Sequence, residues 1–387
     1  MAIKKVLQIS KYYYPFIGGT EQVARDIVNA LKMNSDIEQK ILCFNEDAKM
    51  GNMVCTKNET KIDYVDGVEV IRCGYFAKIS SQSISATIPS AMKKVMTDFK
   101  PDIVILHYPN PYVTHYLLKY KNLSFKLIIY WHLDITKQKV LKKFINSQNI
   151  ALIKRADKII GATPKHVNES AYTPFFEGKK EILPYAIDEE RLAIRDEEKH
   201  QADIIKRKYN GKMLCFFIGR HVPYKGLEYL IEASKYVSDN IHFIIAGQGE
   251  LTEELKRKAE GDQKIEFVGK ISDTQWRSYL WACDVFCFPS ITRNEGFGLA
   301  LAEGMYYGKP AVTFTIPGSG VNYVNLDGET GIECSNSNSY EYSEALQKLL
   351  LNKELRLDMG QAAKERIKNN FTAKQFAVNI LKLIESL

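Results

Sequence analysis

SITRNEGFGLALAEGMYYGKP, residues 290–310, is the stretch of sequence that decides the fold. It follows a short apolar run, Val285–Phe288, whose composition is typical of a buried strand. A polar loop leads into an apolar helix predicted over Phe297–Tyr307, and a second apolar run, Ala311–Phe314, follows it. A strand, a loop, a helix and another strand in this order are typical of a parallel sheet covered by helices.

The same alternation of short strands and amphipathic helices extends in both directions along the chain. Further strands are predicted at Lys4–Ser10, Glu38–Phe44, Val68–Cys73, Ile103–His107, Lys126–Trp131, Lys158–Gly161, Met213–Ile218, Ile241–Ala246 and Lys264–Val268. Further helices are predicted at Thr20–Met33, Ile88–Phe99, Ile135–Arg155, Lys225–Val237, Thr252–Gly261, Thr274–Ala282, Tyr340–Leu351 and Ala373–Ser386. This pattern predicts an α/β fold with two doubly wound domains.

The break between the two domains is predicted at the segment EILPYAIDEERL, which holds a proline and then an acidic turn. We expect one Rossmann-like domain over residues 1–186, a second over 187–370, and a final helix over 371–387. Asp196–Lys208 is strongly charged and is expected to form a surface helix. Ligands of open α/β sheets bind at the carboxyl ends of the strands, so a cleft between two such domains is the predicted site.

The composition is that of a globular protein. The chain has 387 residues, of which 45% are hydrophobic and 26% are charged, so intrinsic disorder is excluded. No apolar run reaches the ~18–20 residues that cross a bilayer, and the N-terminal MAIKKVLQIS lacks a signal-peptide core. The seven cysteines are an odd number without a CxxC pair, which argues against a disulfide framework. We therefore expect a cytoplasmic protein.

The net charge of +7 comes entirely from the first half of the chain. Residues 1–200 hold 30 lysines and arginines against 23 acidic residues, whereas residues 201–387 hold 23 of each kind. This asymmetry favours either an anionic partner, such as membrane headgroups, or a mildly basic soluble domain. The basic amphipathic segment 136–158 is interpreted either as a helix lying on anionic lipid or as one packing on its domain. Nucleic acid is not expected, since no basic stripe carries base-stacking aromatic residues.

The segment FFIGRHVPYKGLEYLIEA, residues 216–233, has the features of an anion site. Arg220 lies at the carboxyl end of a predicted buried strand, and Lys225 follows at the predicted start of a helix. Two cations beside a helix N-terminus suit a diphosphate; the alternative is two solvated surface cations. Gly18 and Gly19 are a weaker signal of the same kind, because they precede another helix and let backbone amides approach a ligand.

Two glutamates in the deciding stretch suit the hydroxyl groups of a ligand. Glu295 lies in the loop before the helix and Glu303 within it, so the rise per residue separates them by roughly 8–10 Å. That spacing fits one carboxylate on a sugar and the other on a ribose, with backbone amides after Gly296 on the phosphates between them. Alternatively, Glu295 is a helix-start charge and Glu303 an exposed helix residue, although an unpaired charge beside the apolar neighbours of Glu303 is costly.

Several common cofactor and catalytic motifs are absent from the sequence. The Gly-x-Gly triplets at 247–249, 296–298 and 318–320 lack the third glycine of a dinucleotide fingerprint. No GxxxxGK[ST] segment occurs, which excludes a P-loop, and neither HExxH nor GxSxG is present.

The two doubly wound halves and the residues described above resemble the GT4 family of retaining glycosyltransferases, which have the GT-B fold. The resemblance rests on the glycine pair, on Arg220 with Lys225, and on Glu295 spaced by seven residues from Glu303. It covers the whole chain and is strongest over about 213–332. It implies an N-terminal acceptor-binding domain facing a C-terminal donor-binding domain across a cleft, with the last helix crossing back onto the first domain.

The resemblance implies a role for each matching residue. His132, in the strand-end sequence IIYWHLD, would contact the donor sugar, and Arg220 and Lys225 would stabilise the leaving diphosphate. Glu295 would hold a sugar hydroxyl, which completes the implied catalytic set. Without the family, His132 and His107 are interpreted as core histidines. The implied donor-binding residues are Gly18, Gly19, Arg220, Lys225, Ile271, Glu295, Gly296, Phe297, Gly298, Leu299 and Glu303.

The implied reaction moves a hexose from a UDP- or GDP-sugar to a saccharide, with retention of the anomeric configuration. No metal and no cofactor are implied, because the cations take the place of a metal. The implied acceptor is lipid-linked, which suits capsule or O-antigen polysaccharide synthesis at the inner face of the plasma membrane. The alternatives are a nucleotide-sugar 2-epimerase of the same fold and a non-catalytic, membrane-associated scaffold.

Two segments depart from the family pattern. The linker reads Pro184-Tyr185-Ala186 where the family often has Pro-Asn-Gly. The loop Gly318-Ser319-Gly320 is not followed by the usual glutamate. The sequence leaves the hinge geometry and the role of that loop open.

Overall fold

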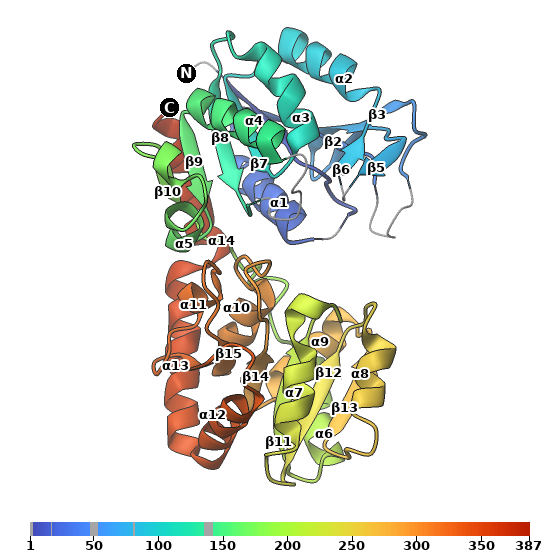
Figure 1. The fold of residues 1–387 in the computed structure, drawn as a ribbon, viewed down its shortest axis with the longest axis vertical. Coiled ribbons are helices and arrows are strands. Elements are labelled where there is room, and N and C mark those ends of the chain that lie inside the picture. Colours follow the sequence, from blue (N-terminus) through green and yellow to red (C-terminus); the bar gives the residue numbers. More distant parts are fainter. Residues whose placement is uncertain (1–2, 17, 47–52, 80–81, 135–141) are drawn as a thin grey trace. The chain divides into compact units, whose positions relative to one another are not determined.

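The computed structural model describes residues 3–16, 18–46, 53–79, 82–134 and 142–387. The chain divides into two compact units, each with its own sheet (Figure 1). Unit 1 holds Met1–Ala186 together with Ala373–Leu387, and unit 2 holds Ile187–Thr372. The C-terminal segment therefore belongs to the same unit as the N-terminus.

Unit 1 is built on an eight-stranded sheet with the order β10-β9-β8-β7-β1-β2-β4-β3. These strands are β1 (Lys4–Ile9), β2 (Ile37–Phe44), β3 (Thr60–Val65), β4 (Val68–Cys73), β7 (Ile103–Tyr108), β8 (Lys126–Trp131), β9 (Lys158–Gly161) and β10 (Lys180–Ile182). Neighbouring strands are parallel except for β3 and β4, which form an antiparallel pair at one edge. A separate hairpin is formed by β5 (Ala77–Ile79) and β6 (Gln82–Ile84).

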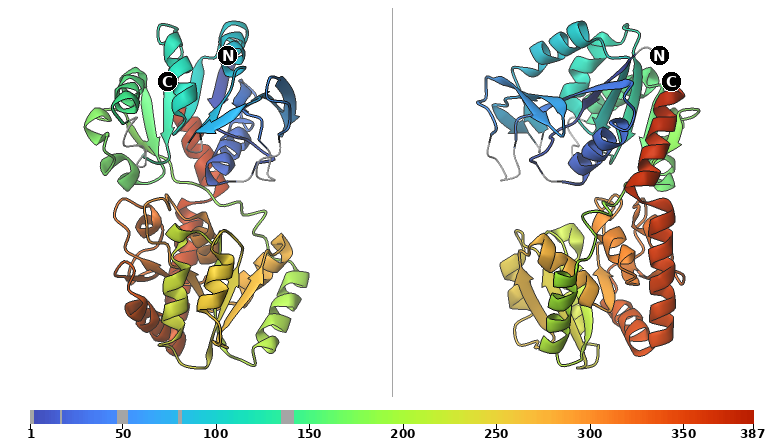
Figure 2. Two further views of the ribbon diagram at one scale, coloured as in Figure 1. Left: turned by 45° about the vertical axis from the view of Figure 1, so that its right-hand side comes forward. Right: turned by 180° about the vertical axis from the view of Figure 1, so that it is seen from behind.

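Helices cover both faces of this sheet (Figure 2). They are α1 (Gly19–Leu31), α2 (Ile88–Lys94), α3 (Pro111–Leu117), α4 (Lys142–Arg155), α5 (Pro164–Asn168) and α14 (Ala373–Glu385). The central strand β7 is buried along its whole length, as expected of a strand with helices on both sides. α14 packs against α1, and Nζ of Lys4 donates a 2.9 Å hydrogen bond to the carbonyl of Ile384.

Unit 2 has a parallel six-stranded sheet with the order β13-β12-β11-β14-β15-β16. Its strands are β11 (Met213–Ile218), β12 (Ile241–Ala246), β13 (Ile265–Gly269), β14 (Val285–Phe288), β15 (Ala311–Phe314) and β16 (Gly331–Cys334). Its helices are α6 (Asp196–Lys208), α7 (Leu227–Ser234), α8 (Thr252–Lys258), α9 (Asp273–Ala282), α10 (Leu299–Tyr306), α11 (Val321–Val324), α12 (Ser339–Leu351) and α13 (Lys353–Asn370). The chain adds β12 and β13 on one side of β11 and then β14 on the other, which creates a topological switch point.

Two differences from the sequence predictions have clear physical causes. The strand β3 was not predicted because its sequence, TKIDYV, is polar and largely exposed at the sheet edge. The predicted helix Lys225–Val237 was wrong at its start, since Pro223–Lys225 forms a 3₁₀ turn and α7 begins only after Gly226. Lys225 therefore lies just before a helix rather than in its first turn.

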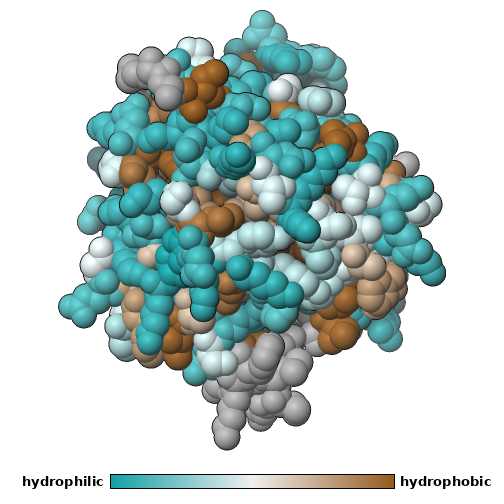
Figure 3. Space-filling model, turned by 90° about the horizontal axis from the view of Figure 1, so that it is seen from above, coloured by the Kyte–Doolittle hydropathy of each residue, from teal (hydrophilic) through white to brown (hydrophobic). Residues whose placement is uncertain are grey.

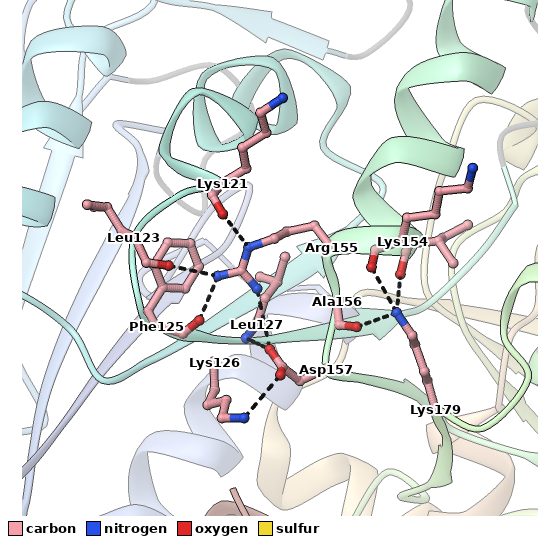
Figure 4. Close-up of polar contacts among 11 residues, drawn as sticks. Lys121, Leu123, Phe125, Lys126, Leu127, Lys154, Arg155, Ala156, Asp157 and Lys179 are labelled. Carbon is pink, nitrogen blue, oxygen red and sulfur yellow. Dashed lines mark hydrogen bonds and ion pairs between the residues drawn. The ribbon is translucent and has the colours of Figure 1, made fainter.

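The C-terminal end of α4 is fixed by two basic side chains (Figure 4). The Arg155 guanidinium donates hydrogen bonds to three carbonyls of the segment 121–125. Leu152, on the same helix, is fully buried in the core of unit 1. Nζ of Lys179 donates to carbonyls at the helix end, which belong to Ile153, Lys154 and Ala156. These contacts favour the interpretation of α4 as a helix that packs on its domain; residues 136–141 of the basic segment lie outside the described residues.

In the described part of the chain, no helix is long and apolar enough to cross a membrane. The face drawn in Figure 3 is mainly hydrophilic, and its hydrophobic residues lie in separated patches. Scattered apolar residues of this kind are ordinary on a folded protein.

Candidate active site

The loops that follow β11 and β14 meet at the switch point of unit 2. The first loop covers residues 219–226 and the second covers 289–298. The backbone N–H of Ile291 donates a 3.0 Å hydrogen bond to the carbonyl of Tyr224, so the two loops are tied to each other. The segments predicted to bind phosphate and sugar are therefore direct neighbours at the edge of the sheet where open α/β proteins bind ligands.

Lys225 and Glu295 form an ion pair across these two loops. Their side chains are only 10% and 12% exposed. Ser290 Oγ donates a 3.0 Å hydrogen bond to Oε2 of the same carboxylate, and Nζ of Lys225 lies 4.9 Å from the ring centroid of Phe288. Because desolvating two charges is costly, a pair buried at a ligand-binding edge points to a role beyond stability.

The loop that carries Glu295 is held from the side by the segment Gly318–Gly320. Ser319 Oγ donates a hydrogen bond to the backbone carbonyl of Glu295. The backbone N–H of Gly320 donates a 2.8 Å hydrogen bond to the carbonyl of Gly296. The segment whose role the sequence left open thus positions the glutamate loop.

Gly226 and Gly298 adopt the left-handed conformation, and each lies where the backbone closely approaches a neighbouring group. Gly226 has a φ of 61°, and a Cβ there would lie 2.1 Å from the carbonyl oxygen of Pro289. Gly298 has a φ of 87°, and its Cβ would lie 3.2 Å from the ring of Phe288. A side chain at either position would strain the backbone; at Gly226 it would also push the two loops apart, whereas at Gly298 it would crowd the ring of Phe288 on β14.

The other predicted residues of this unit differ in how deeply they are buried. Arg220 is exposed at the carboxyl end of β11, where its guanidinium donates a 3.2 Å hydrogen bond to the hydroxyl of Tyr224. Phe297 is buried, and Leu299 begins α10, whose first N–H groups lack intrahelical partners. Ile271 is half-buried in the loop between β13 and α9.

Glu303 lies inside α10 and faces a cation that the sequence did not single out. Nη1 of Arg191 is 3.8 Å from its Oε1. Burial raises the pKa of Glu303 to about 7, although the charge of Arg191 opposes this shift. Arg191 is itself held by Asp273 at 3.3 Å and stacks 4.5 Å above the ring of Trp276. The carboxyl group predicted to bind a ribose is therefore partly buried, titratable near neutral pH, and paired with a guanidinium that Asp273 and Trp276 contact.

In unit 1, Gly18 and Gly19 lie at the start of α1, beyond the carboxyl end of β1. Here too the chain reverses its direction of strand addition, between β1 and β7. A Cβ on Gly18 would lie 2.3 Å from a carboxylate oxygen of Glu21, whereas open space surrounds Gly19. Burial raises the pKa of Glu21 to about 7. Gly18 therefore makes room for a carboxyl group that the sequence analysis missed.

His132 follows β8 and is buried in unit 1. Its Nε2 lies 3.0 Å from Nδ1 of His107, and Nε2 of His107 lies 3.1 Å from Oε1 of Gln8. Its other nitrogen, Nδ1, is hydrogen-bonded to the hydroxyl of Tyr185. Burial holds the pKa of His132 well below its usual range and lowers that of His107 to about 3. Both imidazoles are therefore neutral, and all four ring nitrogens have partners within unit 1.

Comparison with known proteins identifies the family of this chain. The model of "Glycosyltransferase Family 4" matches residues 17–191, and that of "Glycosyl transferases group 1" matches residues 198–366. The chain belongs to the GT4 glycosyltransferases. This glycosyltransferase is 26% identical over 374 residues to O-antigen chain mannosyltransferase C of Escherichia coli, with 95% of each chain covered. It is 28% identical over 276 residues to D-rhamnosyltransferase WbpZ of Pseudomonas aeruginosa, with 70% of each chain covered.

Solved structures share the fold of this glycosyltransferase over nearly its whole length. Sucrose-phosphate synthase from Thermosynechococcus elongatus matches with a TM-score of 0.77 at 16% identity, covering 99% of this chain and 98% of that one. HepE from Anabaena, in complex with UDP, matches with a TM-score of 0.76 at 15% identity, covering 99% of this chain and 100% of that one. The predicted GT-B fold is confirmed.

Three residues to which the sequence analysis assigned no role in this glycosyltransferase contact the two predicted glutamates. They are Ser290, Ser319 and Arg191, and each lies in a segment discussed above without being singled out. Tyr185 was noted as a departure from the linker pattern, and that departure was the one available signal for its contact with His132.

Proposed function

We propose that this glycosyltransferase moves a hexose-type sugar from a nucleoside diphosphate sugar to a saccharide acceptor, with retention of the anomeric configuration. The observation that carries the proposal is the buried Lys225–Glu295 pair at the switch point of unit 2. Further support comes from relatives named as a mannosyltransferase and a rhamnosyltransferase, and from solved neighbours in complex with UDP and UDP-glucose.

The cations of unit 2 suit the charge that the reaction creates. Breaking the bond between the anomeric carbon and the phosphate leaves negative charge on the diphosphate and positive charge on the sugar ring. Lys225 and Arg220 would stabilise the departing diphosphate, together with the N–H groups at the start of α10. We propose that these groups make a metal ion and other cofactors unnecessary.

The pairing of Lys225 with Glu295 explains how a carboxylate is tolerated beside a diphosphate. An ammonium group has three N–H donors, so Lys225 can satisfy the carboxylate and still donate to a phosphate oxygen. Glu295, neutralised in this way, remains an acceptor for a hydroxyl of the transferred sugar. The hydroxyl of Ser290 on Oε2 fixes the orientation of the carboxylate.

Glu303 and its neighbours suit the nucleoside. A carboxyl group with a pKa of about 7 can both donate and accept hydrogen bonds near neutral pH, which matches a ribose diol. Arg191 would keep this group oriented, and the backbone of Ile271 would touch the base. The proposed donor path therefore runs from the loop after β13, past α10, to the paired loops after β11 and β14.

For the acceptor we propose a lipid-linked saccharide of a cell-surface polysaccharide, such as O-antigen, with peripheral contact of unit 1 to anionic lipid. The acceptor hydroxyl would attack the anomeric carbon on the face that the diphosphate leaves. Its proton would pass to a leaving phosphate oxygen, and the new C–O bond would retain the configuration. The basic excess of the first half of the chain supports an anionic acceptor or surface.

A donor screen tests the proposal. Thermal unfolding is followed with UDP-, GDP- and dTDP-sugars, since a bound donor stabilises the folded state. We expect one nucleotide series to raise the midpoint for the wild type and for Glu228→Gln, whose carboxylate pairs with Lys258 on the surface. The midpoint shift should be lost in Glu295→Gln. Product anomers are then read by NMR, and an inverted configuration or equal shifts in both variants would contradict the proposal.

A further inference from the structure

Arg191 turns one end of its guanidinium toward Glu303 and uses the other end on a different helix of unit 2. Its Nε and Nη2 donate 3.3 Å hydrogen bonds to the two carboxylate oxygens of Asp273, the first residue of α9. The guanidinium lies 4.5 Å from the ring centroid of Trp276, which is buried. The backbone carbonyl of Arg191 accepts a 3.1 Å hydrogen bond from Arg277. Among the contacts of the described residues, Nη1 is therefore the guanidinium nitrogen that remains to face Glu303.

Nη1 of Arg191 and Oε1 of Glu303 are too far apart for a direct hydrogen bond. They are separated by 3.8 Å, whereas an N–H···O hydrogen bond spans about 2.7–3.2 Å. In the part of the chain that the structure describes, neither of these two atoms has a hydrogen-bond partner. Both side chains reach the surface, with 46% of Arg191 and 17% of Glu303 exposed. The two atoms are therefore a donor and an acceptor that a ligand can reach.

One hydroxyl group fits between these two atoms. An oxygen about 2.9 Å from Nη1 and about 2.7 Å from Oε1 spans their separation, and both lengths are ordinary for hydrogen bonds. A polar separation of this size is typical of groups that a third group bridges. The bridging group must accept from Nη1, which can only donate, and donate to the ionised carboxylate, which can only accept. A hydroxyl does both, whereas a phosphate oxygen or a carbonyl only accepts and an amide N–H only donates.

We propose that Arg191 and Glu303 together bind one hydroxyl of the ribose of the donor nucleotide. This inference rests on the proposed function, because it requires a nucleoside beside α10. It assigns Arg191 a contact with the substrate itself, in addition to its contact with Glu303. Because a ribose hydroxyl both donates and accepts, a donor and an acceptor placed around it distinguish a ribonucleotide from a deoxy analogue. Arg191 then acts as a specificity-determining residue that selects a ribonucleoside diphosphate sugar over a deoxy form.

Calorimetry on the full chain measures the preference for the ribose hydroxyl. The ligands are GDP and UDP, each compared with its 2′-deoxy and its 3′-deoxy analogue. For the wild type we expect removal of one of these hydroxyls to weaken binding about 100-fold, since each of two hydrogen bonds to a charged group contributes about tenfold. Arg191→Met should lower this ratio to about tenfold. The matched control is Arg207→Met, which removes an exposed arginine from α6 of the same unit and should keep the wild-type ratio.

A double variant separates a direct contact of Arg191 from an indirect one. In Glu303→Ala the hydroxyl keeps Nη1 of Arg191, so a ratio of about tenfold should remain, and adding Arg191→Met should abolish it. If Arg191 only orients Glu303, the ratio disappears in Glu303→Ala already and the second substitution changes nothing. Arg191→Lys is a milder variant, because it keeps a cation but loses the planar fork that reaches Asp273 and Glu303 together, and it should also lower the ratio. Each ratio compares two ligands on the same variant, so a change in stability affects both.

The outcomes distinguish this inference from the proposed function. Equal binding of ribonucleotides and both deoxy analogues to the wild type, or an unchanged ratio in Arg191→Met, would overturn the inference and leave the proposed donor binding intact. A ratio that disappears in Glu303→Ala alone would also overturn it. If neither GDP nor UDP binds the wild type, the proposed donor role fails and the inference fails with it. A ratio that falls in Arg191→Met, persists in Arg207→Met and disappears only in the double variant supports the inference.

Discussion

Replacing Lys225 by methionine should damage both the stability of unit 2 and catalysis. The substitution keeps most of the side-chain volume and removes the charge that faces Glu295. The carboxylate then remains 12% exposed with the hydroxyl of Ser290 as its nearest remaining partner. Breaking a buried ion pair in this way costs ~3–5 kcal/mol. Because both side chains retain some contact with water, we expect about 3 kcal/mol, which lowers the unfolding midpoint by about 6–12 °C.

The loss of turnover in Lys225→Met should exceed the loss that its lower stability explains. Loss of a preorganised charge at a developing anion lowers kcat by about 100- to 1000-fold. The double variant Lys225→Met/Glu295→Gln separates the two effects, because it removes the uncompensated charge but not the catalytic defect. Its midpoint should return most of the way to that of the wild type, while its turnover stays low.

The assay is thermal unfolding combined with release of nucleoside diphosphate in the presence of acceptor. The matched control is Lys258→Ala, which breaks the surface pair with Glu228 that is 43% and 48% exposed. Surface pairs contribute about 0–1 kcal/mol, so this variant should keep its midpoint and its turnover. Wild-type turnover in Lys225→Met, or equal midpoints for Lys225→Met and Lys258→Ala, would refute the reasoning.

Three further predictions follow from single contacts. Gly226→Ala should lower the stability of unit 2 by more than ~3 kcal/mol in urea unfolding, because the added Cβ would lie 2.1 Å from a backbone oxygen. The control Gly211→Ala has a similar φ of 73° but open space around it, so it should cost only about 1 kcal/mol. Equal losses in the two variants would contradict the prediction. Because the pKa of Glu303 rises from 4.5 to about 7 on folding, the native state holds more protons, and urea unfolding should show a loss of up to ~3 kcal/mol as pH rises through this range. Glu303→Gln should reduce this slope and leave only the part that comes from Glu21 of unit 1, whereas an unchanged slope would contradict the prediction. Ser319→Ala should lower kcat/KM about tenfold by freeing the carbonyl of Glu295, whereas Ser343→Ala, which loses a carbonyl contact in α12, should leave it unchanged.

The sequence predicts the strands well where they are buried on both faces. The central strands β7 and β11 are short apolar runs covered on both faces, and such runs are recognisable without any tertiary information. β3 escapes prediction because an exposed edge strand carries no such pattern. The sequence placed the start of α7 too early, because Pro223–Lys225 forms a 3₁₀ turn. This turn ends at Gly226, whose backbone lies against the neighbouring loop, and local sequence does not encode that contact.

The sequence identifies only some of the residues of the candidate site. Lys225, Glu295 and Glu303 lie in segments whose residue types and spacing predict binding of a diphosphate, a sugar and a ribose. Their partners Ser319 and Arg191 are fixed by the order of strands and loops, which no local spacing encodes. The same holds for the partners of His132, which are His107 on β7 and Tyr185 after β10.

The position of a bound nucleotide tests the central claim most directly. A crystal structure of this glycosyltransferase with the nucleotide sugar selected by the donor screen would locate the diphosphate. We predict a phosphate oxygen within hydrogen-bonding distance of Lys225 Nζ and of the N–H groups at the start of α10. A diphosphate bound elsewhere, with Lys225 contacting Glu295 and no phosphate, would contradict it.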